Sequence, residues 1–222
     1  LQNAGHEVIL VSSGAIGLGM GKLGLMDRPK DTPGKQACAA VGQCELMYLY
    51  DNLFSEYSIT VAQLLLTKYI LLEDRRKNVE NALERLISQG VIPVVNENDT
   101  VAIDELELEM GENDSLAAVV ATIANADLLI IMSDIDGLYD SDPRQNPDAK
   151  MIPVVREISE DIHAVAGGAG TKFGTGGMAT KIHAVEIAYE SDIDVVLMNG
   201  QHPKKLYELF EDKPVGTLFH KG

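Results

Sequence analysis

Short apolar segments alternate with longer stretches of helical spacing, and this alternation limits the possible folds of the chain more than any other feature. The apolar segments are rich in β-branched residues, which is typical of strands buried in a parallel sheet. Strands and helices in alternation predict a three-layer α/β/α sandwich with a largely parallel central sheet. We expect a single domain over residues 1–222. The expected strands are residues 8–11, 60–66, 91–95, 128–132 and 195–198, and the expected helices are about residues 32–58, 73–90, 116–126, 178–190 and 204–210.

The net charge of −16 excludes some classes of partner. Such a surface repels the phosphates of nucleic acids and anionic membranes, so sequence-independent binding to either is not expected. No apolar run reaches the roughly 18 residues that a membrane span needs, and residues 1–6 lack the pattern of a secretory signal. Cys38 and Cys44 share an expected helix but lie on different faces, so they cannot pair locally. Small buried thiols fit a reducing compartment, and we expect a cytoplasmic protein.

Clusters of acid and amide side chains are the strongest functional signal. Residues 96–99 (Asn-Glu-Asn-Asp) directly follow an expected strand, and residues 111–114 (Gly-Glu-Asn-Asp) come a short distance later. Residues 12–15 and 133–134 also follow strands. Ligands bind at the carboxyl ends of parallel strands, so these clusters should converge on one edge of the sheet. Acid and amide pairs suit a small polar substrate, a metal-bound phosphate, or both.

A glycine-rich stretch over residues 167–177 is the second signal, because it leads into an expected helix. The N–H groups at a helix start attract phosphate. Lys181 lies about one turn inside that helix and could stabilise charge in a phosphoryl transfer. A surface turn with a solvated lysine is the alternative interpretation. Residues 19–24 and 174–179 match the dinucleotide fingerprint by letter, but neither follows a strand immediately, so a nicotinamide cofactor is not expected.

Other patterns point away from special chemistry. Residues 15–24 read as a glycine-dense loop, and residues 103–110 alternate apolar and acidic side chains as an exposed strand does. Residues 134–137 resemble the start of a calcium loop, but the rest of its spacing fails. The histidines are not in ligand spacing, so no metal-ligating side chain is expected. Ser13 lacks the surroundings of a nucleophile and fits a hydrogen-bond donor to a substrate.

Several motifs follow one another in a single order along the chain: residues 11–16, 96–99, 111–116, 133–139, 142–144 and 174–181. In this order they resemble the amino acid kinase superfamily and, more narrowly, the glutamate 5-kinase family. The resemblance covers almost the whole chain, as far as residues 215–219. The motifs at 133–139 and 176–181 recur in related kinases. The pair 96–99 and 112–116 is much closer to the glutamate 5-kinases.

The resemblance implies that ATP donates its γ-phosphoryl group to the side-chain carboxylate of L-glutamate. The product would be glutamyl 5-phosphate, in the first step of proline biosynthesis. Ser13, Asp99 and Asn113 match positions that bind glutamate. Lys181 would stabilise the transferring phosphoryl group, Asp114 would organise the catalytic lysines, and Mg²⁺ would bridge the ATP oxygens. The nucleotide-binding positions would be Ser133, Asp134, Thr175, Gly176, Gly177, Met178, Ala179, Thr180 and Lys181. The glycine turn and the acid and amide loops would then face each other across one cleft.

The sequence departs from the family pattern in two ways. The family opens with a strand and a glycine loop that carry a second phosphate-contacting lysine, and the sequence begins after that element. A polypeptide that truly starts at Leu1 is expected to lack a sheet strand and to have severely reduced activity. Many members also carry a carboxyl-terminal PUA domain, which is not expected here. The family further implies a homo-oligomer, a dimer or tetramer, and feedback inhibition by proline. A related kinase for another acid or a nucleoside monophosphate, and a non-catalytic glutamate- or proline-binding module, are the alternatives.

Overall fold

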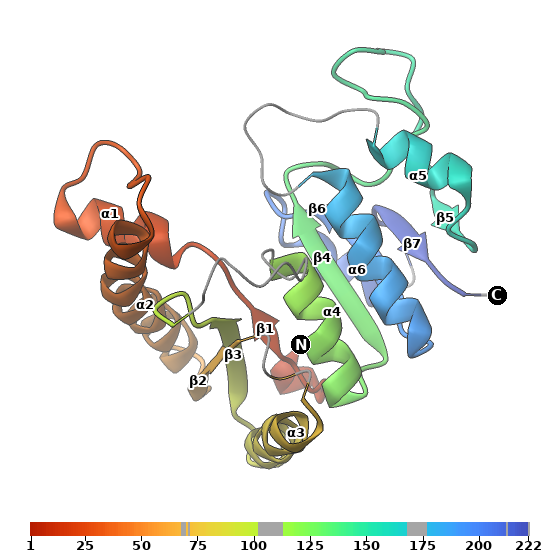
Figure 1. Cartoon of the computed structure of the whole chain (residues 1–222). Coiled ribbons are helices and arrows are strands. Elements are labelled where there is room, and N and C mark those ends of the chain that lie inside the picture. Colours follow the sequence, from red (N-terminus) through yellow and green to blue (C-terminus); the bar gives the residue numbers. More distant parts are fainter. Residues whose placement is uncertain (68–69, 71, 102–112, 168–176, 212, 222) are drawn as a thin grey trace. The chain divides into compact units, whose positions relative to one another are not determined.

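The computed structural model describes residues 1–67, 70, 72–101, 113–167, 177–211 and 213–221. The chain forms two compact units, Leu1–Asn113 and Asp114–Gly222, and each of them combines strands with covering helices (Figure 1). The expected α/β class with mostly parallel strands is confirmed, and the strands are distributed over two hydrogen-bonded sheets. That the two units make up a single domain stays a prediction. No helix among the described residues is long and apolar enough to span a membrane.

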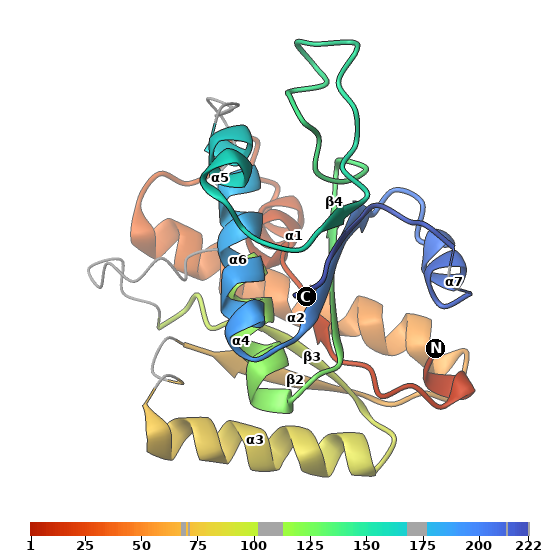
Figure 2. The same cartoon turned by 90° about the vertical axis from the view of Figure 1, so that its right-hand side faces the viewer.

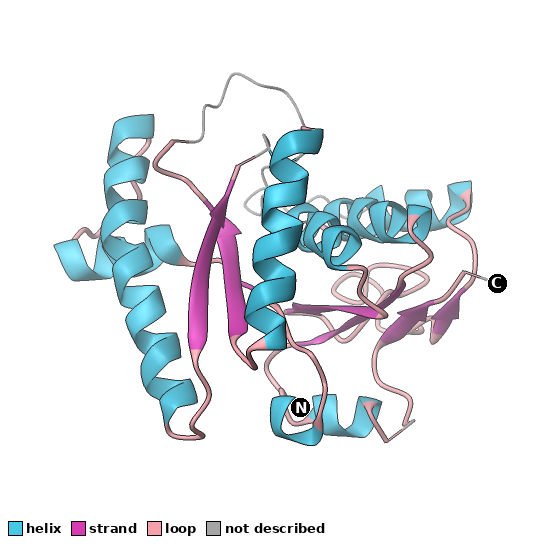
Figure 3. Ribbon diagram, turned by 90° about the horizontal axis from the view of Figure 1, so that it is seen from below, coloured by secondary structure: helices cyan, strands magenta, loops and turns pink. Residues whose placement is uncertain are grey.

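The first unit contains a parallel sheet in the order β1-β3-β2. Its central strand is β3 (Ile92–Glu97), which is flanked by β1 (Leu10–Val11) and β2 (Val61–Leu66). Residues 92–96 are buried, as expected for a strand that is covered on both faces. The sheet lies between α2 (Thr32–Ser55) and α3 (Glu73–Ser88), as Figure 3 shows. A short 3-10 helix, η1, covers Gln2–Ala4.

A helix, α1 (Ala15–Leu23), occupies the stretch that was expected to be a glycine-dense loop, so that expectation was wrong. Its glycines serve packing against α2. A Cβ atom on Gly19 would lie 1.8 Å from the carbonyl oxygen of Cys38, and one on Gly42 would lie 1.7 Å from that of Ala15. The two helices therefore approach backbone to backbone, which requires glycine at both positions. The first match to the dinucleotide fingerprint begins inside this helix and forms no phosphate-binding turn after a strand.

The second unit contains a sheet in the order β4-β6-β7-β5. The strands β4 and β6 run parallel, as do β5 and β7, whereas β6 and β7 run antiparallel. The carboxyl ends of β4 and β6 coincide, since Ser133 pairs in register with Asn199. The strands are β4 (Leu128–Ser133), β5 (Val154–Val155), β6 (Asp194–Asn199) and β7 (Thr217–Phe219).

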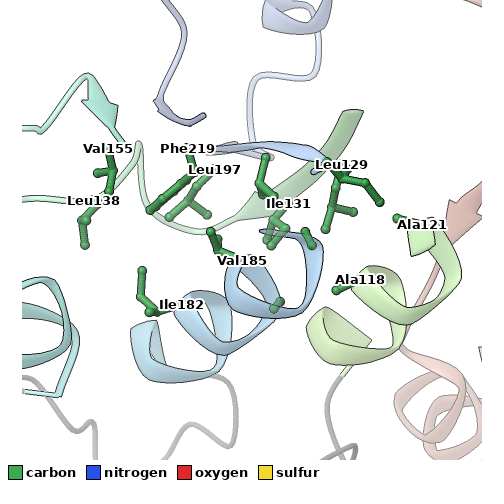
Figure 4. Close-up of a cluster of buried hydrophobic side chains, with 14 of the residues drawn as sticks. Ala118, Ala121, Leu129, Ile131, Leu138, Val155, Ile182, Val185, Leu197 and Phe219 are labelled. Atoms are coloured by element: carbon green, nitrogen blue, oxygen red, sulfur yellow. The ribbon is translucent and has the colours of Figure 1, made fainter. Parts of the chain in front are cut away.

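Helices cover both faces of this second sheet. One face packs against α4 (Asn113–Ala124), α5 (Glu160–Gly167) and α6 (Met178–Glu190). The core between them includes Ile131, Leu197 and Phe219 from the sheet, with Ala118 and Val185 from the helices (Figure 4). The short helix α7 (Lys205–Leu209) lies on the other side of the sheet (Figure 2). The second unit is therefore a three-layer arrangement.

A buried threonine ties the loop after β4 to the last strand. Thr217 is inaccessible to solvent. Its hydroxyl accepts the N–H of Leu138 at 2.8 Å and donates to the carbonyl oxygen of Ile152 at 2.7 Å. A Cβ atom on Gly137 would lie 2.7 Å from the same hydroxyl oxygen. The hydroxyl therefore satisfies two backbone groups that would otherwise be buried without a partner.

Candidate functional site

Polar side chains of the first unit meet where β1 and β3 end. Asn113 Nδ2 donates to the carbonyl oxygen of Ser12 at 2.9 Å and to Asn96 Oδ1 at 3.4 Å. Ser12 is buried, and its hydroxyl lies 2.9 Å from that of Tyr50 on α2. Asn96 is buried too and is the last residue but one of the central strand. These contacts connect the loop after β1, the end of β3 and the first residue of α4, so the site is built on rigid elements.

The hydrogen bonds continue from Asn96 into the body of the unit. Asn96 Nδ2 donates to Gln43 Oε1 at 3.0 Å, and Gln43 Nε2 donates to Gln63 Oε1 at 3.1 Å. Asn96 Oδ1 also accepts the N–H of Glu97 at 2.9 Å. We call these four side chains, Gln63, Gln43, Asn96 and Asn113, the amide chain. Asn113 was predicted as a site residue, and Asn96 belongs to the predicted acid and amide cluster at residues 96–99, but Gln43 and Gln63 were not predicted. Glutamine in a helix or strand is normally solvated, and no spacing pattern marks these two residues.

Ser13, a predicted glutamate-binding residue, is exposed between β1 and α1. The next residue, Gly14, has a φ of 102°, a value that favours glycine, and it precedes the first residue of α1. The first N–H groups of a helix have no acceptor within it, and they favour a negative group. The serine hydroxyl and these N–H groups together suit a carboxylate.

Asp99, the second predicted glutamate-binding residue, follows the same central strand. It is half-buried. Burial raises the pKa of its carboxyl, and the guanidinium of Arg28 lowers it in part. Within the described part of the chain, no hydrogen-bond or ion-pair partner of this carboxylate is recorded. A half-buried acid without a fixed partner is suited to a cationic group of a ligand.

The second unit contains the predicted catalytic pair. Lys181 Nζ lies 2.9 Å from Asp114 Oδ2, and the two side chains are 10% and 23% exposed. Both residues lie near the starts of their helices, α6 and α4. The structure therefore brings together the two residues for which the family resemblance implies catalytic roles. An ammonium group held next to two helix starts provides positive charge at one place in this unit.

The start of α6 contains most of the predicted phosphate-binding residues. Gly177 is the N-cap of the helix and has no side chain to cap it. The hydroxyl of Thr180 donates to the carbonyl oxygen of Gly177 at 2.8 Å. Met178 and Ala179 are the first residues of the helix. Thr175 and Gly176 lie outside the described residues. The described part of the motif therefore leaves backbone N–H groups available for an anion.

The other predicted nucleotide-binding residues lie where β4 ends. The Ser133 hydroxyl donates to Asp134 Oδ1 at 3.2 Å, and the exposed Asp134 forms an ion pair with Arg144 at 3.4 Å. On the neighbouring strand, Asn199 Nδ2 donates to Asp136 Oδ1 at 2.9 Å. Asn199 was not predicted from the sequence, although its place at the end of a parallel strand is a usable signal. Polar groups from β4 and β6 are thus adjacent in one unit.

The predicted residues form two half-sites, one in each unit. The amino-acid half-site contains Ser13, Asp99 and Asn113, and the nucleotide half-site contains Ser133, Asp134, residues 177–180 and the Lys181–Asp114 pair. That the two half-sites face one cleft stays a prediction, as do the individual roles. In the described ranges, no group of three or more His, Cys, Asp or Glu side chains is arranged to hold a metal ion.

Comparisons with known proteins agree on one family. The model of the amino acid kinase family matches residues 1–199. A protein of Clostridium perfringens named glutamate 5-kinase is 52% identical over 220 residues, which are 98% of this chain and 82% of that protein. One of Enterococcus faecalis with the same name is 48% identical, over 100% of this chain and 83% of its own length.

A solved structure agrees on the fold. The crystal structure of the T. acidophilum isopentenyl phosphate kinase product complex has a TM-score of 0.62 and 19% identity, and the match covers 99% of this chain and 87% of that one. At this identity the match supports the fold alone. The family match and the two relatives lead to one conclusion: the chain belongs to the amino acid kinase family, in the group of the glutamate 5-kinases.

Proposed function

We propose that this protein transfers the γ-phosphoryl group of ATP to the side-chain carboxylate of L-glutamate. The products are glutamyl 5-phosphate and ADP, and the reaction is the first step of proline biosynthesis. The observation that carries the proposal is the 52% identity to a relative named glutamate 5-kinase, along 98% of this chain. The chemistry of the two half-sites agrees with it, since the groups of one suit an amino acid and those of the other suit a polyphosphate.

The amino-acid half-site offers groups that match those of glutamate. The Ser13 hydroxyl and the first N–H groups of α1 are donors that suit the α-carboxylate. Asp99 and Asn113 offer acceptor oxygens that suit the ammonium group. The side-chain carboxylate of glutamate is then the remaining polar group and acts as the nucleophile. Its oxygen forms a bond to the γ-phosphorus while the bond from that phosphorus to the leaving ADP oxygen breaks.

The nucleotide half-site would bind ATP through Ser133, Asp134 and residues 175–181. The N–H groups at the start of α6 suit phosphate oxygens, and Lys181 would neutralise the charge of the transferring phosphoryl group. Asp114 holds that ammonium group in place through the 2.9 Å contact. When Mg²⁺ is bound with ATP, it supplies further charge neutralisation. No covalent enzyme intermediate is needed, because alignment and charge compensation lower the barrier.

The test is a measurement of ADP release from Mg-ATP with L-glutamate, L-aspartate, N-acetylglutamate or UMP as the acceptor. We expect release with glutamate and a much lower rate with the others. Asp99→Ala and Asn113→Ala should raise the KM for glutamate strongly and leave the KM for ATP nearly unchanged. Asn52→Ala, on the exposed face of α2, is the control that should alter neither.

Each alternative has its own signature in this assay. Release with UMP or another acid in place of glutamate would identify a related kinase. Glutamate binding in a calorimeter without any ATP turnover would identify a binding module. Equal losses for ATP and glutamate in the Asp99 and Asn113 variants would contradict their assignment to the substrate.

Three further properties belong to the same proposal. We expect a homo-oligomer, which light scattering would measure, and inhibition by proline, which would appear as a rise in the KM for glutamate. A cytoplasmic location is the third. Each rests on the family relationship, and each can be tested without the others.

A further inference from the structure

We propose that Gln43 is a positioning residue of the amino-acid half-site. Through Asn96, it fixes which end of the Asn113 carboxamide is presented to the substrate. This inference rests on the proposed function, because it concerns how the same half-site recognises an amino group. Gln43 is buried on α2, at 9% exposure, and the contacts of the amide chain connect it to Asn113 through Asn96.

The sense of the amide chain is fixed by backbone groups at two points. The carbonyl oxygen of Ser12 can only accept, so the atom of Asn113 that lies 2.9 Å from it is the amide nitrogen. The N–H of Glu97 can only donate, so the atom of Asn96 that lies 2.9 Å from it is Oδ1. Asn96 therefore points its nitrogen at Gln43, which must accept with Oε1. Gln43 in turn has only its nitrogen left to offer Gln63.

This order determines what Asn113 can offer a ligand. Its amide nitrogen has two hydrogens, and the contacts to Ser12 and to Asn96 Oδ1 use both of them. Within the described residues, Oδ1 of Asn113 has no recorded partner. The remaining polar atom is therefore an acceptor, which suits an ammonium group and disfavours an acceptor group of an acylated amine.

Gln43 maintains this order because it is the acceptor for the Asn96 amide. Without that acceptor, Asn96 would bury an amide nitrogen with no partner, which costs free energy. Turning the Asn96 carboxamide over would not solve the problem, because its nitrogen would then face the N–H of Glu97. The Asn96 side chain would have to adopt another conformation, and Asn113 would lose one of its two hydrogen bonds. A buried network with one member removed loses the order of its remaining members.

If Gln43 only satisfied a buried hydrogen bond, its replacement would weaken the binding of every ligand of the site alike. If Gln43 positions Asn113, its replacement should weaken only the binding of ligands that carry an amino group. Glutarate separates the two roles, since it is glutamate without the amino group. Its inhibition constant against glutamate should not depend on the Asn113 acceptor oxygen, whereas the KM for glutamate should.

The experiment compares the unaltered protein with three variants in the ADP-release assay. Gln43→Met keeps the approximate volume and removes the acceptor. Gln43→Glu restores an acceptor for Asn96, and the exposed Gln63 can turn its amide to donate to the new carboxylate. Gln36→Met is the matched control, because it makes the same change on α2 outside the amide chain. The measured quantities are the KM for glutamate, the KM for ATP, kcat and the inhibition constant of glutarate.

Gln43→Met should raise the KM for glutamate about tenfold, the loss expected from one buried hydrogen bond. The inhibition constant of glutarate and the KM for ATP should stay unchanged. Gln43→Glu should regain most of the glutamate affinity, and Gln36→Met should match the unaltered protein. Calorimetric titration of glutamate into each folded variant provides a second readout that does not depend on turnover.

Three results would overturn the positioning role alone: an unchanged KM for glutamate in Gln43→Met, an equal loss for glutamate and glutarate, or a Gln43→Glu variant no better than Gln43→Met. If the unaltered protein releases no ADP with glutamate, the proposed function fails and this inference fails with it. The two failures are therefore distinguishable by the first measurement in the series.

Discussion

The contact between Lys181 and Asp114 can be tested by a double-mutant cycle. Asp114→Asn keeps the shape of the side chain and removes its charge, and Lys181→Met keeps the aliphatic stem and removes the ammonium. Two unit charges at 2.9 Å attract by about 6 kcal/mol at an effective dielectric constant of about 20. Both side chains are largely buried, so desolvation offsets most of that energy. We expect a coupling energy of about 1–3 kcal/mol, the range of charged pairs in direct contact.

The assay is urea unfolding of the unaltered protein, the two single variants and the double variant. Lys181 has a further interaction besides this contact. The Lys181→Met substitution removes that interaction both with Asp114 and with Asn at position 114, so its energy cancels in the coupling energy. In the kinetic assay, Lys181→Met should lower kcat about 100-fold or more and leave the KM for glutamate almost unchanged. A coupling energy of zero in folded variants would show that the pair does not form in solution. The role of Asp114 as the residue that holds the ammonium would then fail.

Burial raises the pKa of the Asp99 carboxyl, so the KM for glutamate should rise on acidification at a higher pH than for an ordinary aspartate, and Asp99→Asn should abolish that rise. The same variant should raise the urea midpoint at neutral pH, where the native carboxylate is charged and half-buried, but not in acid, where the native carboxyl is uncharged. Gly42→Ala should destabilise the protein by about 1–3 kcal/mol, because its new methyl group meets the α1 backbone. The control Gly17→Ala, in open space on α1, should be neutral or stabilise by up to about 1 kcal/mol. Similar urea midpoints for the two variants would contradict the packing argument. Chelation of divalent cations with EDTA should stop ADP release and added Mg²⁺ should restore it, whereas release that persists in EDTA would refute the role of Mg²⁺.

The order of strands and helices could be predicted because each element has a local signal. Apolar runs such as residues 128–132 mark buried strands, and they lie in β4 as expected. The helix α1 could not be predicted in the same way. Its glycines lower the local helix propensity, and the reason for them is a contact with α2 that only the folded chain contains. The strand β7 was missed as well, since Thr217–Phe219 is too short to show a period.

The candidate site likewise contains residues with a local sequence signal and residues whose contacts only the folded chain shows. Ser13 and Asp99 follow expected strands. Together with Asn113 they were predicted to bind glutamate because they match motifs of the family, and these roles stay predictions. The contact of Lys181 with Asp114 joins residues 67 positions apart, and only the resemblance connected them beforehand. Gln43 could not have been found, because its partners are 20 and 53 positions away and carry no shared pattern. Long-range polar contacts of this kind are set by tertiary structure, which hydrophobic periodicity does not encode.

The hydroxyl of Thr217 has a consequence for the order in which segments of the protein can fold during synthesis. It holds the N–H of Leu138 and the carbonyl oxygen of Ile152, both in the segment that follows β4 and Asp134. That segment leaves the ribosome long before residue 217 does. Until the last strand emerges, two backbone groups of the segment have only water as a partner. Nascent chains stalled before this threonine should therefore show rapid amide exchange at Leu138, even where the other helices and strands have already formed.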